Sequence, residues 1–68
     1  MKDDFGARLK EIRIKNKITL RELAKILNVN FSTISRWEND EISPSINYLK
    51  SICDYFDISA DYLIGRID

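Results

Sequence analysis

The chain has 68 residues and a mass of 8.0 kDa, the size of one small domain. Its composition, 44% hydrophobic and 32% charged, is that of a globular domain and not of a disordered segment. The absence of histidine and the single cysteine exclude histidine-based catalytic triads, an internal disulfide and a four-cysteine zinc site. We therefore expect no enzymatic activity, no cofactor and no metal.

No membrane or export signal is evident in the sequence. The longest uncharged stretch, residues 26–35, is far too short to cross a bilayer. The first residues do not combine the charged, apolar and small-residue regions of a secretory signal. We expect a cytoplasmic protein that does not contact a membrane.

The net charge is zero, but the charges are unevenly distributed along the chain. Eight basic and two acidic residues lie between Arg8 and Trp37, whereas two basic and seven acidic residues lie between Glu38 and Asp68. A locally positive surface attracts a polyanion whatever the total charge of the protein. Two solvated helix faces of opposite sign would give the same distribution.

Apolar residues recur at helical spacing along the whole chain, and no alternating run is long enough for a strand. The pattern predicts an all-α domain of five short helices, at about residues 5–15, 20–27, 31–39, 46–56 and 60–64. The predicted N-caps are Asp4, Thr19, either Asn30 or Ser32, Ser45 and Ser59. Glu22, three residues after Thr19, completes a capping box.

The second and third predicted helices have the composition of a helix-turn-helix, two helices joined by a short turn. Ala24 is small enough for a close helix crossing, and Asn28 tolerates the left-handed backbone of a sharp turn. Val29 supplies the apolar residue that plugs the turn. Ile34 and Trp37, three residues apart, would anchor the third helix to the core.

The opposite face of the third predicted helix is polar apart from one aromatic residue. It comprises Asn30, Phe31, Ser32, Ser35, Arg36 and Asn39. Short polar side chains allow close approach to base edges in the major groove, and an arginine can form two hydrogen bonds with guanine. An ordinary pair of helices with a solvated face would show the same spacing.

The segment LRELAKILNVNFSTISRWEN, residues 20–39, resembles the helix-turn-helix of the Cro and phage-repressor type, the xenobiotic-response-element family. The likeness extends to residues 5–13, to Pro44 and Ser45, and to residues 58–63. It implies a compact five-helix, lambda-repressor-like DNA-binding domain, here a single domain over residues 1–68. It also implies a transcriptional regulator that binds a two-fold symmetric operator in double-stranded DNA, and we expect a repressor.

The resemblance also implies roles for individual residues. The base-reading positions fall on Phe31, Ser32 and Arg36. Phe31 would contact a thymine methyl group or help the helix to dock, and Arg36 would read guanine or contact a phosphate. Phosphate contacts are expected from Thr19, Arg21, Lys25, Thr33 and Asn39.

Three departures or special features accompany the resemblance. Leu20 stands where relatives often have a phosphate-binding glutamine, and Asp40-Glu41 stands where they often have glycine and a basic residue. Two carboxylates close to phosphates would lower the affinity for DNA. Arg13 and Glu38 match a buried ion pair of lambdoid repressors that would lock the first helix to the third; otherwise they are two exposed charges.

Two questions remain open from the residues alone. The acidic loop and acidic second half favour an alternative function, a protein-binding module such as an antitoxin or antirepressor that pairs with a related repressor. The 68 residues fit either a complete protein or the amino-terminal domain of a longer one.

We expect a weak homodimer, because apolar residues gather near the C-terminus: Ile58, Ala60, Tyr62, Leu63 and Ile67.

Overall fold

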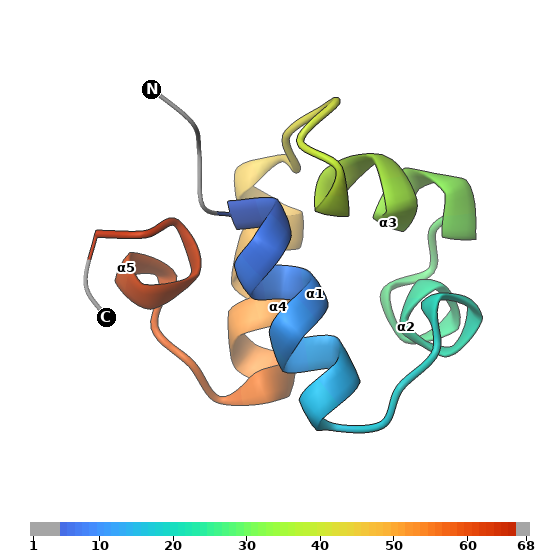
Figure 1. Cartoon of the computed structure of the whole chain (residues 1–68), viewed down its shortest axis with the longest axis horizontal. Coiled ribbons are helices and arrows are strands. Elements are labelled where there is room, and N and C mark those ends of the chain that lie inside the picture. The colour runs from blue at the N-terminus through green and yellow to red at the C-terminus, as the bar shows by residue number, and fades with distance from the viewer. Residues whose placement is uncertain (1–4, 67–68) are drawn as a thin grey trace.

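The computed structural model describes residues 5–66, and these residues form five helices and no strand (Figure 1). The helices are α1 (Phe5–Lys15), α2 (Leu20–Leu27), α3 (Phe31–Glu38), α4 (Ile46–Phe56) and α5 (Ala60–Leu63). The predicted all-α class is confirmed, and the predicted third and fifth helices are each one residue too long at the C-terminus. The N-cap predicted at Asp4, and Ile67 of the expected dimer surface, lie outside the described residues.

The helices lie around a common centre that α1 and α4 occupy (Figure 1). α2 and α3 lie on one side of this central pair and α5 on the other. The longest helices, α1 and α4, have 11 residues each, against the roughly 20 that a membrane-spanning helix needs. None of the helices in the described part is long and apolar enough to cross a membrane.

Every helix contributes at least one fully buried side chain to a single core. These side chains are Leu9, Leu23, Ile34, Trp37, Ile52 and Leu63. Ile26 has helical spacing with Leu23 but is 43% exposed. The buried stripe of α2 consists of Leu23, Ala24 and Leu27. Because successive helical residues are rotated by about 100°, Ile26 lies outside this stripe, next to its edge at Leu23.

Local capping explains where the helices begin and end. Thr19, Ser45 and Ser59 each accept a hydrogen bond from the backbone N–H three residues later, as predicted. Asn28 ends α2 in the left-handed region, with φ 58° and ψ 49°. A left-handed residue also lies one or two positions after the end of each other helix: Lys17, Asp40, Asp57 and Gly65. Four of these five positions are therefore occupied by residues other than glycine, which adopt this conformation at a cost.

Candidate nucleic-acid interface

α3 presents one apolar face to the core and one polar face to solvent. Ile34 and Trp37 are 0% and 2% exposed and hold the helix against the rest of the domain. Ser32 and Arg36, one helical turn apart, are exposed on the opposite side. Among the described residues no side chain pairs with the Arg36 guanidinium. The helix therefore projects a short hydroxyl and an available arginine from a rigidly held backbone.

An ion pair joins α3 to α1. Arg13 Nε donates to Glu38 Oε2 at 2.6 Å, and Arg13 Nη2 donates to Glu38 Oε1 at 3.1 Å. The two side chains are only 10% and 6% exposed. Arg13 Nη1 also donates to the Ile18 carbonyl at 2.9 Å. The structure thus brings together the two charges that the resemblance pairs, and a bidentate geometry of this kind sets the angle between the helices.

The loop after α3 is tied to the start of α1. Asp40 is left-handed, with φ 60°, and its Oδ1 accepts a hydrogen bond from the Gly6 N–H at 3.1 Å. A Cβ atom on Gly6 would lie 2.7 Å from both Asp40 Oδ1 and the Trp37 carbonyl oxygen. Only glycine allows α1 to approach the end of α3 this closely. The Asp40 carboxylate therefore caps α1, a role that the sequence analysis missed when it assigned both loop carboxylates to the surroundings of DNA phosphates.

Phe31 begins α3 and is 44% exposed. The Arg21 guanidinium lies over its ring, with Cζ 4.4 Å from the ring centroid. Arg21 is also exposed, in the first turn of α2. Lys25 follows Arg21 by one turn on the same face of α2 and is exposed. The basic face of α2, formed by Arg21 and Lys25, therefore adjoins Phe31, the first residue of α3.

The other predicted phosphate contacts differ in their accessibility. Thr19 is exposed, and its Oγ1 accepts from the Glu22 N–H at 3.0 Å. The Thr19 N–H in turn donates to the Glu22 carboxylate at 2.8 Å, and this hydrogen bond lowers the pKa of Glu22. Asn39 is exposed at the end of α3, whereas Thr33 is half-buried.

The basic residues of the first half separate into structural and exposed groups. Arg13 is buried in its ion pair, and Arg8 donates to the Tyr62 carbonyl at 3.0 Å while its guanidinium lies over the Tyr62 ring. The remaining six are exposed: Lys10, Lys15, Lys17, Arg21, Lys25 and Arg36. The positive charge of this half is therefore largely available to a polyanion.

Comparison with known proteins places the chain in a family. The family model described as "Helix-turn-helix" matches residues 9–63, so the chain belongs to this helix-turn-helix family. The structure is similar to that of the P22 c2 repressor in complex with a synthetic operator, with a TM-score of 0.83 and 33% identity. That match covers 88% of this chain and 91% of the repressor chain. The resemblance to phage repressors drawn from the sequence is confirmed.

Two similar proteins are transcriptional regulators by name. The HTH-type transcriptional regulator ImmR of Bacillus subtilis is 36% identical over 62 residues, which are 91% of this chain and 49% of ImmR. The HTH-type transcriptional activator BcrR of Enterococcus faecalis is 31% identical over 62 residues, 91% of this chain and 30% of BcrR. The chain therefore spans about half the length of the first of these relatives and less of the second.

Proposed function

We propose that the protein is a sequence-specific DNA-binding regulator of transcription, a repressor, that reads the major groove with the exposed face of α3. The observation that carries this proposal is that α3 has one face buried in the core and a polar face exposed to solvent. Ile34 and Trp37 hold it against the core, while Ser32 points outward together with Arg36, which has no side-chain partner within residues 5–66. The similarity to a repressor whose structure was solved with a synthetic operator supports the same function. We propose that this regulator acts in the cytoplasm.

Within this proposal, Phe31, Ser32 and Arg36 read bases, and Thr19, Arg21, Lys25, Thr33 and Asn39 contact phosphates. Arg36 is the reader with the most specific chemistry, since its guanidinium matches the O6 and N7 acceptors of guanine. The charge of Lys25 strengthens binding to every sequence alike, because phosphates carry no sequence information.

The protein-binding alternative, an antitoxin or antirepressor, is less well supported. It rested on the acidic loop and the acidic second half of the chain. Asp40 caps the start of α1, so its carboxylate is accounted for by the fold. Six exposed cations remain in the basic half for a polyanion to contact.

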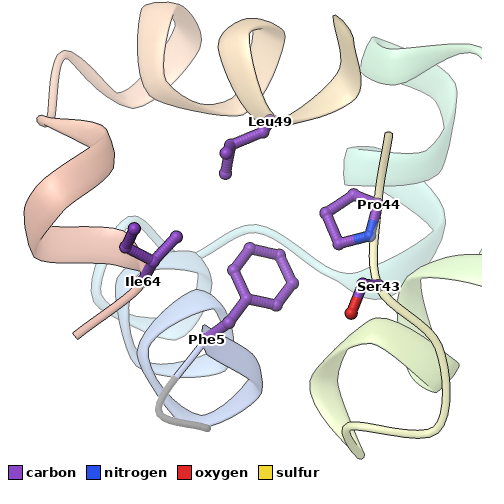
Figure 2. A pocket seen from close by; sticks show the side chains of 5 residues that line it. All are labelled: Phe5, Ser43, Pro44, Leu49 and Ile64. Carbon is purple, nitrogen blue, oxygen red and sulfur yellow. The ribbon is translucent and has the colours of Figure 1, made fainter. Parts of the chain in front are cut away.

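The proposed regulator binds a two-fold symmetric operator as a weak homodimer. Leu63, one of the apolar residues near the C-terminus, is fully buried in the core. An apolar pocket of about 150 Å³ lies next to α5, lined by Phe5, Ser43, Pro44, Leu49 and Ile64. Figure 2 shows these side chains converging on one space from α1, α4 and the segments after α3 and α5. No residue of α2 lines this pocket.

The experiment that tests the function is selection of bound duplexes from a random DNA pool at physiological salt. The proposal predicts an enriched motif with two-fold symmetry, whose half-sites are about one helical turn apart. Arg36→Ala should relax the preference at one position per half-site, whereas Lys25→Ala should weaken binding to all duplexes equally. No enrichment at physiological salt would contradict the proposal.

Sedimentation of the protein with its selected operator tests the dimer separately. Two protomers per operator are expected for the wild type, and Ile64→Glu should reduce this to one by placing a charge at the pocket. The matched control is Ile14→Glu, which places the same charge on α1 at a residue that is 54% exposed and does not line the pocket. Two protomers per operator for both variants would contradict the proposed dimer surface. That result would leave the proposal of DNA binding intact.

A further inference from the structure

We propose that Arg21 is a positioning residue for Phe31, and that the pair reads the 5-methyl group of a thymine in the operator. The inference rests on the proposed DNA-binding function and gives it a specific base. It also adds a second role to Arg21, for which the family resemblance implies only a phosphate contact.

The geometry of the pair is the first argument. Arg21 and Phe31 are ten residues apart and belong to different helices, yet Arg21 Cζ lies 4.4 Å from the centre of the Phe31 ring. This is the distance of a cation–π contact. The guanidinium therefore covers one face of the ring and limits the directions in which the ring can turn.

Both partners are carried by backbone that is held in place. The capping box of Thr19 and Glu22 closes the first turn of α2, in which Arg21 lies. Phe31 begins α3, and Ile34, fully buried three residues later, holds that helix against the core. A contact between two fixed helix starts constrains a side chain more than the same contact between flexible loops.

The exposure of Phe31 is the second argument. Its ring is 44% exposed at the start of the polar face of α3, next to Ser32. A residue needed only to dock the helix would bury its ring as Trp37 does, at 2% exposure. An exposed apolar ring beside base-reading positions has a natural ligand in the methyl group of thymine, which is the one apolar feature of the major groove.

The chemistry of arginine allows one residue to orient the ring and contact the DNA backbone together. A guanidinium is flat and stacks on an aromatic face, while its N–H groups point outward in its own plane and remain available to a phosphate. A lysine at the same position carries the same charge but cannot stack as a plane. Arg21→Lys therefore separates positioning of the ring from the contribution of charge.

The test replaces each thymine of the selected operator in turn by uracil, which differs only by loss of the 5-methyl group. We expect the wild type to bind about fourfold more weakly when one particular thymine per half-site is replaced, the effect of one apolar carbon removed from contact. Phe31→Ser should abolish this difference. Arg21→Lys, which keeps the charge, should lower the fourfold preference for thymine over uracil to about twofold or less.

Lys25→Ala is the matched control, because it removes a cation one turn further along the same face of α2. It should weaken binding to both duplexes and leave the fourfold ratio unchanged. The contact itself is visible without DNA: ring currents from Phe31 should shift the NMR signals of the Arg21 side-chain protons upfield in the free protein. Phe31→Leu should return them to ordinary values.

Several outcomes would overturn the inference while leaving the proposed function intact. One is a wild-type protein that binds its operator but responds to uracil at no thymine. Another is an Arg21→Lys protein that keeps the full fourfold ratio, and a third is the absence of any ring-current shift at Arg21. A wild type that binds no DNA with sequence preference would overturn the proposed function and this inference with it.

Discussion

Arg13→Met should destabilise the protein severely, because it leaves the Glu38 carboxylate in the interior without its partner. Glu38 would lose two hydrogen bonds, of 2.6 and 3.1 Å, while its side chain remains only 6% exposed. Breaking a buried pair by removing one partner costs about 3–5 kcal/mol. A domain of this length has a total stability of roughly 3–10 kcal/mol, so the variant should be close to unfolding.

Thermal and urea unfolding followed by circular dichroism measure this loss. At about 4–8 °C per kcal/mol for so small a domain, the melting temperature should fall by more than about 12 °C. The double variant Arg13→Met with Glu38→Leu should recover at least half of the loss, since no unpaired charge remains.

The chain contains its own control for this experiment. Arg66 and Asp61 form an ion pair whose side chains are 73% and 61% exposed, with 3.6 Å between Arg66 Nε and Asp61 Oδ1. Arg66→Met should change stability by less than about 1 kcal/mol, as is usual for exposed pairs. If Arg13→Met had an effect as small as that of Arg66→Met, the reasoning about burial would be refuted.

Three further predictions concern the ends of helices. Gly6→Ala should lower the free energy of unfolding by about 1–3 kcal/mol in urea titrations, because its Cβ would collide with the backbone at the end of α3; a variant as stable as the wild type would show that α1 can shift freely. Asp57→Gly should raise it by about 0.5–1 kcal/mol, since glycine relieves the left-handed backbone at φ 56° and removes a negative charge from the C-terminus of α4; an unchanged melting temperature would contradict this. The pKa of Glu22 should be below its ordinary value in a carbon-13 NMR titration, because the Thr19 N–H and hydroxyl bind the ionised carboxylate. The stability this provides is present above the unfolded-state pKa and lost as pH falls through the lower folded-state pKa, and Glu22→Gln should remove that part of the acid dependence.

Features set by neighbouring residues could be predicted from the sequence. The caps at Thr19, Ser45 and Ser59 and the left-handed turn at Asn28 depend on contacts within four residues, and the structure confirms them. The inward position of Ile34 and Trp37 follows in the same way from helical spacing. Spacing alone is less reliable at the edge of an apolar stripe, as the exposed Ile26 of α2 shows.

Contacts between distant parts of the chain could not be derived from spacing. The pairing of Arg13 with Glu38 was expected only from the family resemblance. The hydrogen bond between Gly6 and Asp40 joins residues 34 apart, and nothing in the local sequence marks it. The stacking of Arg21 on Phe31 likewise depends on how the turn sets α2 against α3. These contacts hold the loop after α3 to α1 and join α2 to the start of α3, so the candidate interface required the three-dimensional structure.

NMR titration of the labelled protein with its selected duplex tests whether α3 and the start of α2 form the DNA-binding surface. We expect the largest backbone amide shifts at Thr19, Arg21, residues 31–36 and Asn39, at physiological salt. Smaller shifts near Ile64 would accompany dimer formation on the operator. Largest shifts on α4 and α5, or no shifts at this salt concentration, would show that α3 and the start of α2 are not the DNA-binding surface.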